Sequence, residues 1–218
     1  MDMTTTERKL RDGTVSATES TVHYVEAGTG DPVILVHGYA DFSTWRVWEA
    51  NVADLSAERR VIALDLPGYG ESEFRGRDKP VDFLDWFETY AQILYDVIYG
   101  LDLGPAALCG LSAGGCASLL ATTKWPNDVS KLILVDSAGS QAADRWAAIQ
   151  QPTLIVWQRE DKLISVGQGQ ILREAIPNSR IEILEGNGAG IEPHQWHWPQ
   201  ALNPERFNQL ALEFLRDV

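Results

Sequence analysis

The sequence predicts an α/β fold with a doubly wound, mainly parallel sheet and helices on both faces. Short apolar runs alternate along the chain with longer stretches of helical periodicity. Several runs are apolar at every position rather than every second one, which is typical of strands covered on both faces. No fixed-period repeat or low-complexity tract divides the 218 residues, so we expect one domain over residues 1–218.

Six apolar runs predict the strands of the parallel part of the sheet. They lie at 32–36, 60–65, 106–109, 131–136, 152–157 and 180–184. The segment 14–27 alternates weakly and predicts antiparallel edge strands before the parallel part begins.

Helical periodicity predicts five helices between and after these strands. They lie at 43–56, 81–99, 112–123, 167–175 and 203–216. In the second, apolar residues recur at steps of three and four, which predicts one buried stripe. The stripe consists of Phe83, Phe87, Tyr90, Leu94, Val97 and Ile98.

Charge and composition exclude several classes of function. The chain has 31 acidic residues against 18 Lys and Arg, a formal net charge of −13 that would repel nucleic acid. No apolar run approaches the roughly 20 residues that cross a bilayer, and the first residues are polar, so we expect no membrane partner and a cytoplasmic location. Two cysteines are too few for a disulfide scaffold or a zinc ribbon.

The sharpest chemical signal is a Gly-x-Ser-x-Gly pattern at 110–114, centred on Ser112. It follows a predicted strand and precedes a predicted helix, where doubly wound sheets bind ligands. A turn this tight requires glycine on both sides of the serine, and the helix start offers free N–H groups to a developing negative charge. The alternative is a plain strand-to-helix turn in which Ser112 caps the helix.

Together with two further motifs, this pattern resembles the α/β-hydrolase superfamily from about Gly28 to the C-terminus. Residues 36–39, Val-His-Gly-Tyr followed by Trp45, are similar to the family's His-Gly loop. Residues 65–72, Asp-Leu-Pro-Gly-Tyr-Gly-Glu-Ser, are similar to its Asp-x-Pro-Gly-x-Gly-x-Ser segment. The resemblance implies a serine nucleophile and a Ser-His-Asp triad, with no metal and no organic cofactor.

The resemblance also implies an oxyanion hole made by the backbone N–H groups of Tyr39 and Ala113. Donors at these positions stabilise the negative charge of a tetrahedral intermediate. His37 belongs to the same loop, where we expect it to hold the loop rather than react.

Asp161 falls on the family's position for the triad acid. It follows the strand that ends at Trp157, in a segment similar to the family's Gly-x-x-Asp, although Gln158 stands where glycine is usual. Glu160 is the neighbour that could be mistaken for the acid. Asp136, after the preceding strand, is a substitute acid.

The base is the ambiguous member of the triad. The chain has four histidines, His23, His37, His194 and His197. Counting back from the last predicted helix, the segment that begins at His197 resembles the family's His-x-Pro segment. Counting forward from the last strand instead places Ala189 where the histidine would stand. An insertion at 189–196 would leave His197 as the base, with His194 in reserve, whereas a replacement at Ala189 would leave an inactive or slow protein.

Only residues 137–151 occupy the place where many family members carry a helical cap. We expect a short remnant with one helix, 141–149, and an active site that is open to solvent or covered by other loops. A naturally short cap and a removed cap both fit the sequence. Trp196 and Trp198 flank the candidate base, where they would wall a substrate pocket.

The resulting hypothesis is a serine hydrolase that cleaves a small-molecule carboxylic ester through an acyl-enzyme, with Ser112, His197 and Asp161 as the triad. A thioesterase, lactonase or amidase would use the same groups. A protein with a disabled base that only binds ligands is the alternative from another class, and a protein-interaction module is a third. Neither the leaving group nor the oligomeric state follows from the sequence.

Overall fold

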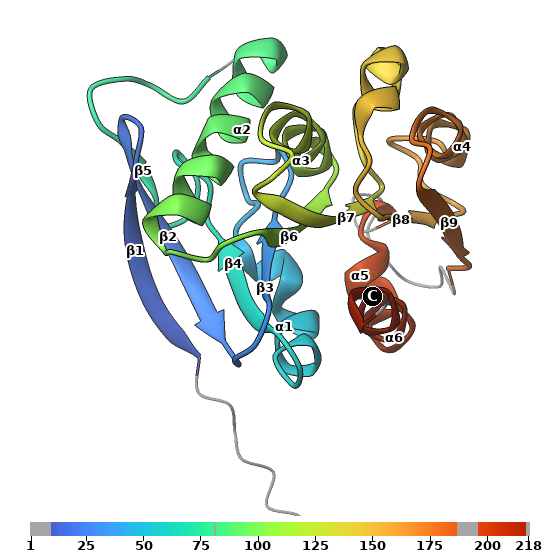
Figure 1. The fold of residues 1–218 in the computed structure, drawn as a ribbon, viewed down its shortest axis with the longest axis horizontal. Helices are drawn as coiled ribbons and strands as arrows, with labels where there is room; N and C mark the ends of the chain where they lie inside the picture. Colours follow the sequence, from blue (N-terminus) through green and yellow to red (C-terminus); the bar gives the residue numbers. More distant parts are fainter. Residues whose placement is uncertain (1–9, 81, 187–195, 217–218) are drawn as a thin grey trace, which may run out of the picture.

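The described strands form one twisted sheet that runs through the middle of the protein (Figure 1). The structure is a computed structural model and describes residues 10–80, 82–186 and 196–216. The strands are β1 (Arg11–Ala17), β2 (Ser20–Ala27), β3 (Pro32–Val36), β4 (Arg60–Leu64), β5 (Glu73–Phe74), β6 (Ala106–Leu111), β7 (Val129–Val135), β8 (Thr153–Gln158) and β9 (Ser179–Leu184). Their order is β1-β2-β4-β3-β6-β7-β8-β9, and β5 pairs with β2.

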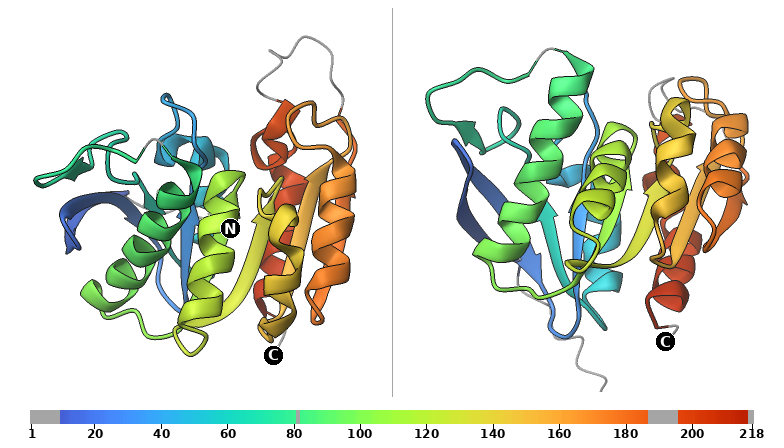
Figure 2. Two further views of the ribbon diagram at one scale, coloured as in Figure 1. Left: turned by 90° about the horizontal axis from the view of Figure 1, so that it is seen from above. Right: turned by 45° about the horizontal axis from the view of Figure 1, so that its top comes forward.

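Helices cover both faces of this sheet (Figures 1 and 2). The α-helices are α1 (Glu49–Leu55), α2 (Phe83–Gly100), α3 (Ala113–Lys124), α4 (Val166–Ala175), α5 (Pro199–Leu202) and α6 (Pro204–Arg216), and the 3₁₀ segments are η1 (Trp45–Trp48) and η2 (Ser140–Ala148). One face packs against α2, α3, η2 and α4, and the other packs against α1 and α6. The predicted α/β fold class is therefore confirmed.

The two-sided covering explains why the parallel strands are apolar at every position. In β3, Ile34 and Val36 belong to the core on the α2 and α3 side, whereas Val33 and Leu35 belong to the core on the α1 and α6 side. All four side chains are fully buried. Successive side chains of a strand point to opposite faces, so both halves of each run are removed from water.

The strand order of the sheet reverses at β3, and this reversal determines where the site lies. From β3 the chain moves to β4 on one side and later to β6 on the other, and all pairs from β4 to β9 are parallel. The register aligns Val36 with Gly110, and Leu111 with Val135. The residues after β3, β6, β7 and β8 therefore meet at one edge, which is where open α/β sheets bind ligands.

Several local predictions are confirmed and others need correction. The weak segment forms the antiparallel hairpin β1–β2. The two-residue strand β5 and the single turn α5 were not predicted, because elements this short carry no periodicity. The helix expected at 141–149 is the 3₁₀ segment η2, which is interrupted by non-helical backbone at Ala142. Phe83 does not belong to the buried stripe, because the first turn of α2 leaves it 56% exposed.

Replacing Ile34 with alanine should lower the free energy of unfolding by about 3 kcal/mol, because the cavity opens in a central strand between two covered faces. Urea unfolding followed by circular dichroism measures it. The matched control is Ile171→Ala in α4, whose side chain is 40% exposed and should cost less than about 1 kcal/mol. Equal losses for both variants would contradict the placement of the core.

Candidate active site

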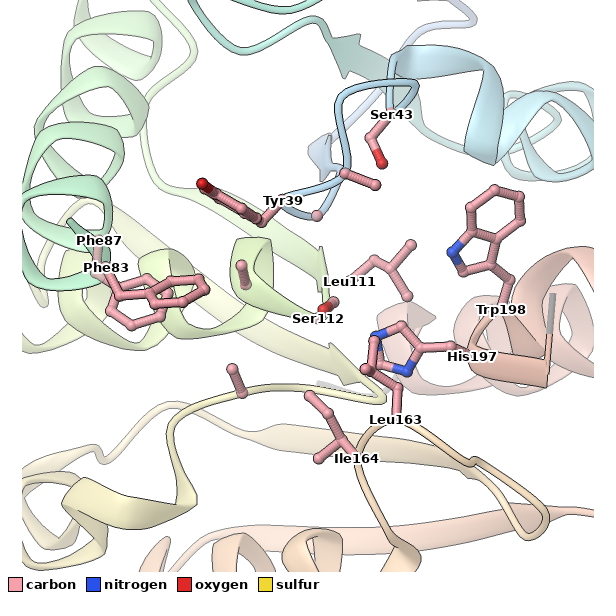
Figure 3. Close-up of a pocket in the computed structure, with 14 residues that line it drawn as sticks. Tyr39, Ser43, Phe83, Phe87, Leu111, Ser112, Leu163, Ile164, His197 and Trp198 are labelled. Atoms are coloured by element: carbon pink, nitrogen blue, oxygen red, sulfur yellow. The ribbon is translucent and has the colours of Figure 1, made fainter. Parts of the chain in front are cut away.

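Ser112 occupies a strained turn between β6 and α3. Its backbone angles are φ 55° and ψ −122°, in the region that non-glycine residues avoid. A Cβ on Gly110 would lie 2.5 Å from the carbonyl oxygen of Gly114, and one on Gly114 would lie 2.3 Å from that of His37. Both glycines are therefore required by close backbone contacts, and the turn presents Ser112 at the pocket wall (Figure 3).

His197 and Asp161 form the central hydrogen bond of the site. His197 Nδ1 lies 2.7 Å from Asp161 Oδ2, and both side chains are buried. Asp161 Oδ1 accepts from the backbone N–H groups of Leu163 at 2.7 Å and Ile164 at 3.0 Å. The carboxylate is thus held by the loop after β8, and its bond to Nδ1 leaves the lone pair of the imidazole on Nε2.

The free nitrogen of His197 faces the pocket that Ser112 also lines. Nε2 is buried and has no hydrogen-bond partner among the described residues. Figure 3 shows the imidazole and the Ser112 hydroxyl on the same wall of the pocket. In ligand-free enzymes, the hydrogen bond between a base and its nucleophile is often long, and it shortens when substrate binds.

The structure also places the competing residues. Glu160 turns away from the site, since its Oε2 accepts from Gln158 Nε2 at 2.7 Å and from the N–H of Gly186 at 3.1 Å. His194 and Ala189 lie outside the described residues. Among the described residues, His197 is the histidine that contacts Asp161.

Asp136 lies beside this pair, directly after β7. Its side chain is fully buried, and its Oδ2 is 3.8 Å from His197 Nδ1. Burial, and next the charge of Asp161, raise the pKa of Asp136 well above its usual value. Asp136, Asp161 and His197 are the cluster of the described residues that could hold a metal ion, with candidate ligand atoms within 4.8 Å of one another.

The candidate oxyanion donors belong to residues next to Ser112 in the sequence or in the neighbouring loop. Ala113 is the first residue of α3, where a helix leaves its N–H groups without intrahelical acceptors. Tyr39 follows Gly38, where an added Cβ would lie 3.0 Å from the Cβ of Ser112. The loop after β3 therefore passes close to the serine, and a side chain at residue 38 would crowd the side chain of Ser112.

His37 holds this loop as a neutral imidazole. Its Nε2 accepts from the N–H of Leu66 at 2.9 Å, and its Nδ1 donates to the carbonyl of Gly38 at 2.8 Å. Burial lowers the pKa of His37 from 6.5 to about 4. A charged ring would lose its acceptor for Leu66, so the loop depends on the neutral form.

The segment at 65–72 also forms hydrogen bonds that stabilise the region after β3. The carboxylate of Asp65 accepts from the N–H groups of Trp45 at 2.7 Å and Glu71 at 3.1 Å. It also bonds His23 Nδ1 at 3.0 Å, and its backbone carbonyl accepts from Ser72 Oγ at 2.6 Å. These contacts give the motif a structural role next to the pocket.

The pocket at the reactive edge is small and apolar. It has a volume of about 380 Å³, and among the described residues that line it there is no Lys, Arg, Asp or Glu. The larger apolar lining side chains are Tyr39, Phe83, Phe87, Leu111, Leu163, Ile164 and Trp198. Trp198 therefore lies where the sequence predicted, whereas Trp196 is not among the lining residues.

The other residues that line the pocket were not predicted from the sequence. Phe83 and Phe87 carried the pattern of a core stripe, and Leu163 sits in an acidic loop. Leu163 is 73% exposed, as an apolar side chain at a pocket mouth can be. Leu163 follows shortly after the end of β8, which was its only signal, whereas Phe83 and Phe87 lie within α2 and carried none.

Comparison with known proteins gives one family and several relatives. The family model described as alpha/beta hydrolase fold matches residues 31–150. A relative from Escherichia coli K12, the 2-hydroxy-6-oxononadienedioate/2-hydroxy-6-oxononatrienedioate hydrolase, is 26% identical over 89% of this chain and 90% of its own. That alignment spans 273 residues against the 218 of this chain, so several tens of the relative's residues have no counterpart here.

Solved structures show the same fold at lower identity. The 2-hydroxy-6-oxo-6-phenylhexa-2,4-dienoate hydrolase from Rhodococcus sp. strain RHA1 has a TM-score of 0.85 at 14% identity, covering 96% of this chain and 100% of that one. A protein described as a predicted CIB-like hydrolase from Thermoplasma acidophilum has a TM-score of 0.84 at 24% identity, covering 97% and 100%. Separately, no helix in the described ranges combines the length and hydropathy needed to cross a bilayer.

The stability of the protein should fall as the pH drops below 6.5, because the unfolded chain then protonates His37 while the folded chain does not. Between pH 7.5 and 5 this group should remove about 2 kcal/mol from the free energy of unfolding. Urea unfolding at both pH values measures it, with His37→Gln as the comparison. A His37→Gln variant with the same pH dependence as the wild type would contradict the assignment.

Proposed function

The chain belongs to the α/β-hydrolase-fold family, and from that premise we propose that it is a serine hydrolase of uncharged carboxylic esters. The observation that carries the proposal is the bond between His197 Nδ1 and Asp161 Oδ2, which leaves Nε2 unpaired on the wall shared with Ser112. A serine hydroxyl needs such an oriented base to react near neutral pH.

In the acylation step, Ser112 Oγ attacks the ester carbonyl while His197 Nε2 takes its proton. Asp161 stabilises the imidazolium and keeps its proton on Nδ1. The N–H groups of Tyr39 and Ala113 donate to the oxyanion, and each such donor typically lowers the barrier by about 3 kcal/mol. His197 then protonates the leaving alcohol, and the acyl group stays on Ser112.

In the deacylation step, water replaces the alcohol. His197 takes a proton from the water, whose oxygen attacks the acyl carbonyl. The tetrahedral intermediate collapses and breaks its bond to Ser112 Oγ, His197 returns its proton to that oxygen, and the carboxylic acid leaves. None of these steps calls for a group beyond the residues named and water.

The lining of the pocket supports an uncharged substrate. A carboxylate transferred into an apolar site without a partner costs several kcal/mol. The described lining residues offer it no cation, and the net charge of −13 also disfavours anions. The relative from Escherichia coli acts on a dienedioate, whose name denotes two carboxylates. We infer that the substrate of this chain is different.

Carbon–carbon bond hydrolysis is the second candidate, and the similarity to this relative favours it. The compound named there contains a ketone and two carboxylates but no ester, so its hydrolysis breaks a carbon–carbon bond. The same triad residues would serve. The apolar lining described above is the feature that favours esters instead.

Replacing Ser112 with alanine should lower kcat/KM for p-nitrophenyl butyrate by roughly 10³-fold or more, because the nucleophile is lost. A fluorophosphonate probe should label the wild type at Ser112 and leave the variant unlabelled, as read by mass spectrometry. The matched control is Ser130→Ala, an exposed serine at the amino end of β7. A wild type that resists the probe would identify the chain as a binding protein with a disabled base.

An acyl chain that ends in a carboxylate should be a poor substrate. We expect kcat/KM for p-nitrophenyl hexanoate to exceed that for mono-p-nitrophenyl adipate by about 30-fold or more, the equivalent of 2 kcal/mol for an unpaired buried charge. Leu163→Lys places a cation at the pocket mouth and should narrow this ratio, whereas Ser130→Ala should not change it. Equal rates for both esters, or faster cleavage of the dienedioate, would refute the assignment of an uncharged ester.

A further inference from the structure

Ser43 contributes a hydroxyl group to the wall of the apolar pocket. Its side chain lines the pocket together with Ser112 and His197, and the residue is 2% exposed. Figure 3 shows its oxygen turned into the pocket from the loop after β3. The triad and the oxyanion donors do not use this hydroxyl, so the proposed mechanism leaves it without a role.

The Ser43 hydroxyl is fixed in place but has no partner within the protein. The N–H of Ser43 donates to the carbonyl of Ala40 at 2.7 Å, and the N–H of Trp45 donates to Asp65 Oδ1 at 2.7 Å, so the loop is held on both sides of the residue. In the part of the chain that the structure describes, Ser43 Oγ forms no hydrogen bond. Buried hydroxyls normally form one, and a hydroxyl that faces a pocket obtains it from water or from a ligand.

Such a hydroxyl makes the pocket selective for one atom of the substrate. A substrate oxygen can replace water on Ser43 Oγ, whereas a methyl group in the same place displaces the water and leaves the hydroxyl unpaired. A site that hydrogen-bonds its substrate therefore rejects the analogue that lacks the bonding atom. The serine hydroxyl both donates and accepts, and it supplies no positive charge, so it suits a neutral alcohol oxygen rather than a carboxylate.

Contacts of the same loop place Ser43 at the leaving-group end of the pocket. The preceding residue, Phe42, packs against Trp198 with ring centroids 5.9 Å apart. Trp198 directly follows His197, which protonates the departing alcohol in the mechanism proposed above. The alcohol half of the ester therefore has to lie near this segment, within reach of the loop that carries Ser43.

The opposite end of the pocket is aromatic. Phe83 and Phe87 of α2 stack with ring centroids 6.0 Å apart, and Phe83 packs against Tyr39 at 4.9 Å. Figure 3 shows these two phenylalanines across the pocket from Trp198, with Ser112 between them. This end suits an apolar acyl chain.

We propose that Ser43 is a specificity-determining residue that hydrogen-bonds a neutral oxygen in the alcohol half of the ester, so that the substrate is an ester of an alcohol that carries a second hydroxyl group. The inference rests on the proposed function above, because it names the substrate class of that same site. The acyl half then lies against Phe83 and Phe87.

The test compares 2-hydroxyethyl butyrate with propyl butyrate, two esters of similar shape in which a hydroxyl group replaces a methyl group. Rates are followed by pH-stat titration of the released butyric acid. Each kcat/KM is divided by the rate constant of the same ester with hydroxide, which removes the difference between the leaving groups. The variant is Ser43→Ala. The matched control is Thr44→Ala, whose hydroxyl accepts from the N–H of Arg46 at 3.3 Å and which is not among the lining residues.

For the wild type we expect the normalised kcat/KM to be about tenfold higher for the hydroxyethyl ester, the size of one hydrogen bond. Ser43→Ala should reduce this preference to about one, whereas Thr44→Ala should keep it. A pair that differs in the acyl half, propyl methoxyacetate and propyl butyrate, should show the same ratio in wild type and Ser43→Ala. Thermal unfolding verifies that each variant folds.

Equal loss of kcat/KM for both butyrates in Ser43→Ala would overturn the proposal, because it would identify Ser43 as a general contributor such as a third oxyanion donor. A wild type without the preference would overturn it as well. A preference that depends on Ser43 only in the acyl pair would place the contact in the wrong half of the ester.

Binding separates this inference from the proposed function. Ser112→Ala cannot form the acyl-enzyme, so NMR titration of this variant gives the Kd of both butyrates without turnover. We expect a Kd about tenfold lower for the hydroxyethyl ester, and no difference in the Ser43→Ala, Ser112→Ala double variant. If this holds while the wild type cleaves no ester, the proposed function fails and the role of Ser43 stands. If the wild type cleaves p-nitrophenyl butyrate but neither experiment shows a preference, only the inference about Ser43 fails.

Discussion

The hydrogen bond between His197 and Asp161 is the interaction on which the site depends. It joins residues that are 36 positions apart, and it orients an imidazole that otherwise has a free nitrogen in an apolar pocket. Asp161 can serve as the anchor because the loop after β8 already binds its other oxygen with two N–H groups. The hydrogen bond between His197 and Asp161 is therefore held in place by a loop that the sheet positions, and catalysis requires such a fixed geometry.

Strain and burial near Ser112 have to be offset by the rest of the fold. A residue at φ 55° costs about 1–3 kcal/mol, and the glycines around it allow backbone contacts that no side chain would permit. The buried neutral His37 adds a further cost at acidic pH. Two apolar cores, one on each face of the sheet, supply the stability that keeps this arrangement in place.

The short segment at 137–151 shapes the chemistry that we propose. It holds η2, and apolar side chains at the pocket, such as Phe83 and Leu163, are left exposed. The relative from Escherichia coli has several tens of residues that this chain lacks. An open apolar pocket relaxes the limits on substrate size, but it offers few polar contacts for recognition, so substrate charge becomes the main discriminator.

The sequence by itself determined the fold class, the hairpin at the edge and the strained turn, because each depends on neighbours along the chain. The uninterrupted apolar run of strand 32–36 and the glycines around Ser112 are local properties. The sequence also nominated Asp161 and His197, but it left His194 and a lost base open. Only the tertiary structure decided that His197 packs against Asp161, that Asp136 lies beside them, and that Phe83 and Leu163 line a pocket. These contacts depend on strand register and on how loops and helices pack at the sheet edge. The spacing of residues along the chain determines neither of them.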